Sequence, residues 1–273
     1  MKTKSLAILG MGKMGEAIAQ GLMQSDLSSQ FKISGTTRSE ESANEVRKRL
    51  KIDCTTSNSN ALKDADIILL AVKPHQAEKI LTENKNAFHE KQLLISICAA
   101  VSTDQLSEWA GHRPAIIRAM PNTPCLIKSG VTALCKGPRS LDSHLKEATA
   151  IFRELGIVTS LEESLFDGVT GLSGCGPAYI YLMIEALSEA GVKVGISRKQ
   201  ATLLAAQTMM GAAKMVLERD EHPAALKDEV TTPAGCTIDG LMALEEGGLR
   251  VTLIKAVLAA TKRSKLMRSS KSE

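Results

Sequence analysis

The stretch that decides the fold is LAILGMGKMGEAIAQGL, residues 6–22. Four apolar residues are followed by Gly10, Gly12 and Gly15, and then by apolar residues at helical spacing. In such a strand–turn–helix unit the first glycine makes the turn, the second admits a pyrophosphate and the third allows close helix–strand packing. N–H groups at the start of the helix then face the anion. The stretch therefore predicts a dinucleotide site at the first strand of a parallel sheet.

Further apolar runs alternate with helical patterns as far as residue 161. The runs lie at 31–35, 66–72, 93–97, 115–120, 130–137 and 156–161. Continuous apolar strands separated by helices predict a mostly parallel sheet built from βαβ units. From 176 to 267 the chain shows helical patterns and no convincing strand. We expect a dinucleotide-binding domain over 1–162 and an all-helical domain over 163–273.

Several of the later helices are apolar or alanine-rich around most of their circumference. Helices without a polar face require burial on all sides. A helical region of this size has little room to bury them by itself. We therefore expect the helical domain to pack against a second copy of the chain as a homodimer, with the size of any higher oligomer left open.

Composition excludes several kinds of function. The 273 residues carry 34 basic and 30 acidic side chains, and so small an excess of positive charge gives no indication of nucleic-acid binding. No run approaches the ~20 apolar residues of a membrane helix, and the first apolar run breaks at Gly10, unlike a signal peptide. The six cysteines form no CxxC motif and have no histidine at metal-binding spacing. They indicate reduced thiols in a cytoplasmic protein without a metal site.

The end of the second strand bears on the choice of cofactor. An NAD site normally places Asp or Glu there to hold the ribose 2′-hydroxyl. This chain has Thr37, Arg38 and Ser39 instead, and the acids Glu40 and Glu41 come only afterwards. Hydroxyls and a guanidinium suit a 2′-phosphate. NADPH is therefore favoured, with NADH as the alternative. Lys73, in AVKP after the central strand, is expected to face the cofactor rather than to be a solvated surface lysine.

Seven motifs, in this order and spacing, resemble one family, the pyrroline-5-carboxylate reductases. They are GMGKMG (10–15), AVKP (71–74), SICAAVS (96–102), MPNTP (120–124), GLSGCGPAY (171–179), EAGVKVGISR (189–198) and TTPAGCTIDGL (231–241). The resemblance implies an α/β fold, with an N-terminal Rossmann-type sheet followed by an all-helical dimerisation domain. It also implies reduction of the cyclic imine 1-pyrroline-5-carboxylate to L-proline by NADPH or NADH, the last step of proline synthesis.

The resemblance also assigns site residues. The cofactor residues it implies are Gly10, Met11, Gly12, Lys13, Met14, Gly15, Thr37, Arg38, Ser39, Asn58, Ala71, Val72, Lys73, Pro74, Cys98, Ala99 and Ala100, of which the last three are expected near the nicotinamide. For the substrate it points to the loop from Thr232 to Thr237, including Gly235 and Cys236, and more weakly to Glu163.

The chain departs from the family at four small residues. The family usually has Gly where Ala100 and Ala234 stand, Ser where Cys175 stands, and Thr or Ala where Cys236 stands. Alanine at 234 is expected to exclude a backbone conformation that glycine tolerates easily. The cysteines indicate exchange of one small residue for another in packing.

The break TTPAGCTIDG, residues 231–240, interrupts two helical patterns. A turn accounts for its proline and Gly235 but leaves three threonines unexplained. We expect Thr237 to cap the following helix, and the N–H groups of Gly235, Cys236 and Thr237 to form an anion nest. With the family resemblance, the anion is the substrate carboxylate. Thr237 is also the candidate catalytic group, a hydroxyl that hydrogen-bonds the ring nitrogen and helps to deliver a proton.

Two other functions fit the same architecture. A β-hydroxyacid dehydrogenase would use a helix-borne lysine as acid and base, and the helical stretch 174–187 contains no lysine. A non-catalytic paralogue would retain the fold as a binding module, but the intact cofactor and loop motifs oppose it. Turnover of the imine with NADPH distinguishes all three.

Overall fold

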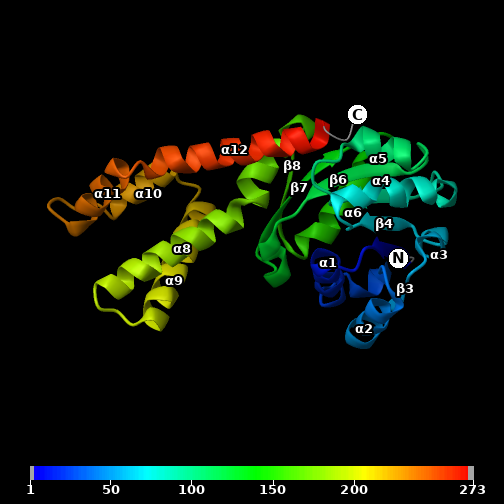
Figure 1. Ribbon diagram of the computed structural model, residues 1–273, viewed down its shortest axis with the longest axis horizontal. Helices are drawn as coiled ribbons and strands as arrows, with labels where there is room; N and C mark the ends of the chain where they lie inside the picture. Colours follow the sequence, from blue (N-terminus) through cyan, green and yellow to red (C-terminus); the bar gives the residue numbers. More distant parts are fainter. Residues whose placement is uncertain (1–2, 270–273) are drawn as a thin grey trace. The chain divides into compact units, whose positions relative to one another are not determined.

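The computed structural model describes residues 3–269, which form two compact units (Figure 1). The first unit runs as far as Gly174 and takes in the chain again from Ala260; the second comprises Cys175–Ala259. Each unit has its own packing. The functional division at 162/163 stays a prediction.

The first unit is built on one eight-stranded sheet in the order β3-β2-β1-β4-β5-β6-β7-β8. All neighbours pair in parallel except β6 and β7, which are antiparallel. The predicted mostly parallel sheet is thereby confirmed. The strands are β1 (Lys4–Leu9), β2 (Phe31–Thr36), β3 (Asp53–Thr55), β4 (Ile67–Leu70), β5 (Leu93–Ser96), β6 (Ala115–Met120), β7 (Gly130–Lys136) and β8 (Gly156–Ser160).

Helices cover both faces of this sheet (Figure 1). One face packs on α1 (Lys13–Met23), α2 (Glu40–Leu50) and α6 (Asp142–Arg153), through side chains such as Ile18, Val46 and Phe152. The other face packs on α3 (Asn58–Lys63), α4 (Pro74–Glu83) and α5 (Thr103–Trp109), through Leu62, Leu81 and Leu106. Because both faces are covered, β4 and β5 are buried along their whole length, which explains their unbroken apolar sequence.

Neither β3 nor α3 was predicted from the sequence. The strand β3 pairs only three residues with β2, and α3 has six residues with a single buried side chain, Leu62. Segments this short do not complete a hydrophobic period, so pattern analysis has little to detect.

After β8 the chain makes a short helix, α7 (Phe166–Val169), and a π-helical turn, Thr170–Gly174. The second unit then contains α8 (Gly176–Lys193), α9 (Arg198–Arg219), α10 (Pro223–Glu229) and α11 (Cys236–Glu246). The last helix, α12 (Leu249–Ser269), begins in this unit and ends in the first. All residues from Gly176 to Met267 are described and none lies in a strand, as predicted.

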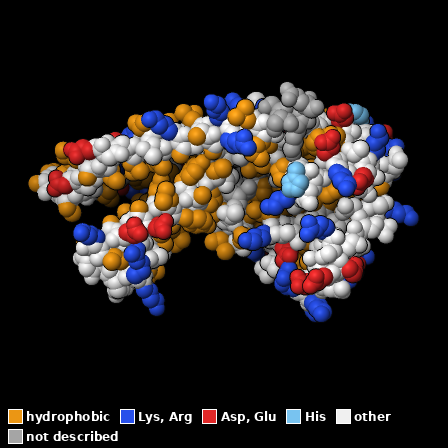
Figure 2. All heavy atoms as spheres, in the orientation of Figure 1, with side chains coloured by type: hydrophobic (Ala, Val, Ile, Leu, Met, Phe, Trp, Pro, Cys, Tyr) orange, Lys and Arg blue, Asp and Glu red, His pale blue; other side chains and the backbone are white. Residues whose placement is uncertain are grey.

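The second unit buries few of its own side chains. Helices α8 and α9 form a close hairpin, in which a Cβ on Gly191 would lie 2.7 Å from that of Ala201. Many large apolar side chains of the unit nevertheless remain exposed, among them Tyr181, Leu182, Leu187, Leu203, Leu204, Met210, Leu217, Met242, Ile254 and Leu258. Figure 2 shows hydrophobic side chains gathered on the visible face of these helices. So much exposed apolar surface is typical of an interaction site between chains.

No helix within residues 3–269 is both long enough and apolar enough to cross a membrane.

Candidate cofactor and substrate sites

The cofactor motifs converge where the sheet order reverses. Strand β1 lies between β2 and β4, so the connections that leave β1 and β4 diverge at their carboxyl ends, which is where ligands bind in open α/β sheets. Gly10 has φ +98°, and a Cβ there would lie 2.7 Å from Val72 Cγ1 and 3.0 Å from the Ala71 carbonyl oxygen. The GMGKMG turn and the AVKP segment, although distant in sequence, are therefore in contact.

Gly15 and Gly12 have different structural reasons to be glycine. A Cβ on Gly15 would lie 2.4 Å from the Gly10 carbonyl oxygen, so Gly15 is required for α1 to pack on the turn. Gly12, the N-cap of α1, has ordinary extended angles, and a Cβ there would meet nothing within 4 Å. The open space in front of Gly12, next to the free N–H groups at the start of α1, fits the pyrophosphate of a dinucleotide.

The remaining residues of the turn fix it to β2. The N–H groups of Gly10 and Met11 donate to the Thr36 carbonyl, at 3.2 and 2.8 Å. The buried Met11 side chain lies against Gly35, where a Cβ would be 2.4 Å from Met11 Cγ. Lys13 is exposed and opens α1, whereas Met14 packs on the core.

The end of β2 offers hydroxyls and a cation. The Thr37 N–H donates to the Thr55 carbonyl and its hydroxyl donates to the Ser39 carbonyl, both at 3.0 Å. The Ser39 hydroxyl caps α2 by accepting from the Ser42 N–H. Arg38 is exposed, and no ion pair of its side chain is found within residues 3–269. Glu40, which could have served an NAD ribose, is paired with Arg47.

Two further segments of the predicted cofactor set, 73–74 and 98–100, lie beside the point where the sheet order reverses. Lys73 is exposed at the N-cap of α4, and Pro74 is the first residue of that helix. The Cys98 thiol donates to the Val72 carbonyl at 3.3 Å, which ties the segment after β5 to the segment after β4. Ala99 is half-buried, and Ala100 is fully buried with φ +55°. Asn58, half-buried at the start of α3, follows β3 on the β2 side of the sheet.

The thiols of this unit are mostly unreactive. Burial raises the pKa of Cys54 and of Cys125, and raises the pKa of Cys135 to about 12, with the nearby Glu163 carboxylate as a second cause for Cys135. All three therefore stay protonated at neutral pH. No group of three or more His, Cys, Asp or Glu side chains in the described part of the chain could hold a metal ion.

Glu163, the weaker substrate candidate, lies in the first unit with specific partners. Its Oε1 accepts from the Thr103 N–H at 2.8 Å and from Arg118 Nη1 at 3.0 Å, and its Oε2 accepts from the Thr103 hydroxyl at 2.6 Å. The Arg118 side chain is only 1% exposed. The substrate role of Glu163 stays a prediction. Thr103 and Arg118 were missed, although the charged residue within the apolar run AIIRAM was a visible signal.

The loop before α11 differs in two details from the expected nest. Gly235, not Thr237, is the N-cap of α11, and it provides no side-chain cap. The Gly235 N–H is also unavailable to an anion, because it donates to the Thr232 carbonyl at 3.0 Å. Thr237 is the second residue of the helix, so its N–H and that of Cys236 have no partner within the helix. The helix begins earlier than expected because residues 232–235 form a tight turn, with Pro233 and Ala234 as its central residues.

Alanine at 234 does not exclude the left-handed conformation. Ala234 has φ +58°, and Ala100, the other alanine at a family glycine position, has φ +55°. Both alanines adopt the backbone that glycine favours, at a cost in strain. Thr232 and Cys236 are exposed, whereas Gly235 and Thr237 are half-buried. The predicted substrate loop lies in the second unit, and all predicted cofactor residues lie in the first.

Two family models match the chain. One, described as pyrroline-5-carboxylate reductase dimerisation, matches residues 163–267; another, described as NADP oxidoreductase coenzyme F420-dependent, matches residues 5–100. The chain is 37% identical to a pyrroline-5-carboxylate reductase of Arabidopsis thaliana, over 97% of this chain and 96% of the relative. It is 38% identical to that of Escherichia coli (strain K12), over 98% and 99%.

Solved structures are similar over the same length. A Plasmodium falciparum pyrroline carboxylate reductase with NADP bound superposes with a TM-score of 0.87 at 35% identity, covering 98% of this chain and 99% of that one. A pyrroline-5-carboxylate reductase from Coxiella burnetii superposes with a TM-score of 0.90 at 35% identity, covering 97% and 99%.

Proposed function

The chain belongs to the pyrroline-5-carboxylate reductase family, and from that premise we propose how its residues divide the work of the reaction. The enzyme reduces the cyclic imine 1-pyrroline-5-carboxylate to L-proline with NADPH, the last step of proline biosynthesis. The observation that carries the residue-level proposal is the contact of Gly10 with Val72 at the point where the sheet order reverses, together with the open space in front of Gly12.

The first unit holds the cofactor. The open space at Gly12 and the N–H groups at the start of α1 receive the pyrophosphate. Thr37, Arg38 and Ser39 receive the 2′-phosphate, because Arg38 is exposed and has no ion-pair partner within residues 3–269. Asn58 lies towards this adenosine end, whereas Ala71–Pro74 and Cys98–Ala100 lie towards the nicotinamide. Bound there, NADPH supplies the hydride.

The loop before α11 holds the substrate. The N–H groups of Cys236 and Thr237 bind its carboxylate, since they have no partner within the helix and lie at its positive end. The exposed Thr232 hydroxyl adds a further donor. Gly235 is required by packing, because a Cβ there would lie 2.5 Å from Thr232 Oγ1.

Little acid–base chemistry is required of the protein. A protonated imine accepts hydride readily, so correct positioning of the ring accounts for much of the rate, up to about 7–11 kcal/mol in favourable cases. The Thr237 hydroxyl hydrogen-bonds the ring nitrogen and passes on a proton from water. A Thr237→Ala enzyme with unchanged kcat and KM would exclude this role.

The enzyme works as a homo-oligomer through the helical region, in agreement with its exposed apolar side chains and the dimerisation family that matches it. We propose a homodimer as the basic assembly, with further association into a larger oligomer, and a cytoplasmic location.

Oxidation of NADPH and NADH, followed in parallel with the imine as substrate, tests this function. We expect turnover with both cofactors and a higher kcat/KM with NADPH. A folded protein that binds NADPH but does not turn over the imine would instead be a binding module. Turnover of 3-hydroxy acids without imine reduction would favour a β-hydroxyacid dehydrogenase.

A further inference from the structure

A buried cation lies beside the carboxyl end of β5, where Arg118 on β6 pairs in register with Ser96. Arg118, on β6, is 1% exposed, and its guanidinium lies 4.8 Å from the centre of the Phe166 ring. Its one carboxylate partner within residues 3–269 is Glu163, and its Nε and Nη2 have no hydrogen bond there. A buried arginine with two unpaired donors depends strongly on that one carboxylate. Arg118 therefore holds the Glu163 carboxylate in a defined place.

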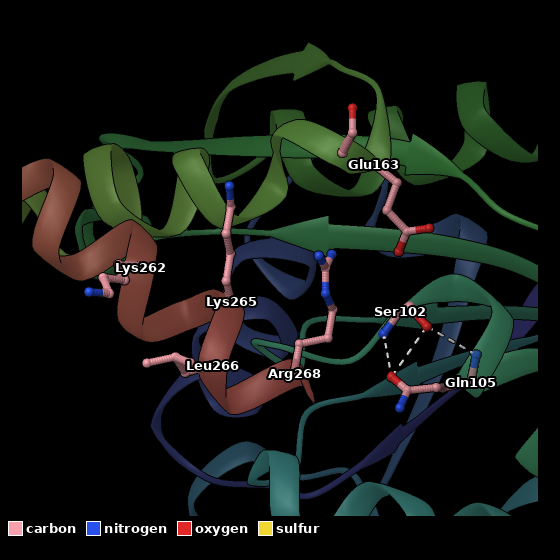
Figure 3. Close-up of a pocket in the computed structure, with 8 residues that line it drawn as sticks. Ser102, Gln105, Glu163, Lys262, Lys265, Leu266 and Arg268 are labelled. Atoms are coloured by element: carbon pink, nitrogen blue, oxygen red, sulfur yellow. Dashed lines mark hydrogen bonds between the residues drawn. The ribbon is translucent and has the colours of Figure 1, made fainter. Parts of the chain in front are cut away.

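The Glu163 carboxylate in turn holds the start of α5. It accepts from both the N–H and the hydroxyl of Thr103, the first residue of that helix. Figure 3 shows the Glu163 side chain reaching towards this end of α5, where Ser102 and Gln105 form a capping box, at the edge of an open cavity of about 810 Å³. The start of α5 is thus fixed by its own cap and by a carboxylate from a segment 60 residues later.

The start of α5 determines the position of the segment before it. Only Val101 and Ser102 separate Thr103 from Ala100, whose left-handed backbone is strained. Strain of this kind persists where the surroundings impose it. The segment Cys98–Ala100 follows β5, on the opposite side of β1 from β2, where the adenosine end binds. It therefore lies at the nicotinamide end of the cofactor.

We infer that the Arg118–Glu163 pair is a positioning device for hydride transfer, in which Glu163 acts through Thr103 to hold Cys98–Ala100 against the nicotinamide. The inference rests on the proposed cofactor site. Glu163 is then a positioning residue that need not touch the substrate. A shift of about 1 Å in a positioning group can cost on the order of 100-fold in rate.

Thr103 offers a matched pair of variants. Thr103 is 4% exposed, so Thr103→Val replaces the hydroxyl with a methyl group of similar size and removes the hydrogen bond to Glu163 Oε2. Thr103→Ser keeps the hydroxyl and removes the methyl group. Both leave the Arg118–Glu163 ion pair intact. Glu147→Gln serves as a control, because Glu147 is an ion-paired carboxylate of similar exposure on α6, 19% against 26% for Glu163.

The experiment compares kcat with the affinities for NADPH and for 2′,5′-ADP, a fragment that lacks the nicotinamide. We expect Thr103→Val to lower kcat by about 10- to 100-fold and to lower the affinity for NADPH. The affinity for 2′,5′-ADP should stay unchanged. Thr103→Ser should restore most of kcat, and Glu147→Gln should resemble the wild type. Glu163→Ala should lower kcat at least as much as Thr103→Val does. Because both changes remove the same hydrogen bond, the double variant should have nearly the kcat of Glu163→Ala alone.

Two results would overturn the inference. One is a Thr103→Val enzyme with wild-type kcat. The other is a Thr103→Val enzyme whose affinities for 2′,5′-ADP and for NADPH fall by the same factor, which would indicate a general structural defect. If Glu163→Ala does not fold because Arg118 is left unpaired, the valine and serine variants still decide. Failure of the proposed function is separate, because the wild-type enzyme would then not reduce the imine at all.

Discussion

Replacing Gly12 with alanine separates cofactor binding from folding. Gly12 has φ −91° and ψ −169°, angles that alanine adopts freely, and a Cβ there meets no atom within 4 Å. Alanine is a poorer N-cap than glycine, which costs about 0.5–1 kcal/mol, but alanine also restricts the unfolded chain, which stabilises the folded state by about 0.4–1 kcal/mol. These effects nearly cancel, so the free energy of unfolding without cofactor should stay within about 0.5 kcal/mol of the wild type.

The added methyl group occupies the space assigned to the pyrophosphate. It would displace the phosphate from the N–H groups at the start of α1, and a hydrogen bond to a charged group contributes about 1.5–3 kcal/mol. With the steric overlap, a loss of about 3 kcal/mol corresponds to a rise of about 100-fold in the Kd for NADPH.

Fluorescence titration with NADPH and thermal unfolding with and without NADPH measure the two effects separately. Gly15→Ala is the contrasting variant, because its Cβ would lie 2.4 Å from the Gly10 carbonyl oxygen. It should lower the free energy of unfolding by about 1–3 kcal/mol even without cofactor. A Gly12→Ala protein that binds NADPH within about threefold of the wild type would refute the placement of the pyrophosphate at this turn.

Three further predictions concern stability and assembly. Ala100→Gly and Ala234→Gly should each raise the free energy of unfolding by about 0.5–1 kcal/mol, because relief of left-handed strain outweighs the added freedom of the unfolded chain; a loss of stability in denaturant titration would contradict this. Because burial raises the pKa of Cys135 from 9.0 to about 12, its stabilising contribution is complete below pH 9 and is lost as the pH rises towards 12. The free energy of unfolding should therefore fall over that range, less steeply in Cys135→Ala, and equal slopes would count against the burial effect. Leu203→Glu, at a side chain 67% exposed within a single chain, should shift the protein towards monomer in sedimentation, whereas an unchanged mass would place the interface elsewhere.

The sequence predicted the sheet and the first cofactor contacts because both follow from local patterns. Gly10, Gly12 and Gly15 predict a turn and a helix without reference to distant residues, and the apolar runs at 66–72 and 93–97 predict buried strands. The short β3 and α3 were missed because three and six residues complete no recognisable period.

Details that depend on backbone angles or on distant contacts could not be predicted. Thr237 was expected to cap α11, but Gly235 is the N-cap and Thr237 is the second residue of the helix. Ala234 was expected to avoid a left-handed backbone that it in fact adopts. The contact of Arg118 with Glu163 joins residues 45 positions apart and required the packing of β6 against the segment after β8. The resemblance to the reductase family, by contrast, is confirmed over nearly the whole chain.

The most direct test of the account is transfer of a labelled hydride. The purified protein would be incubated with 1-pyrroline-5-carboxylate and NADPH that carries deuterium at C4 of the nicotinamide, with each C4 stereoisomer tested, and the proline would be analysed by mass spectrometry. We predict L-proline with a single deuterium at C5 from one of the two stereoisomers. Folded protein that binds NADPH but yields no labelled proline from either would contradict the account.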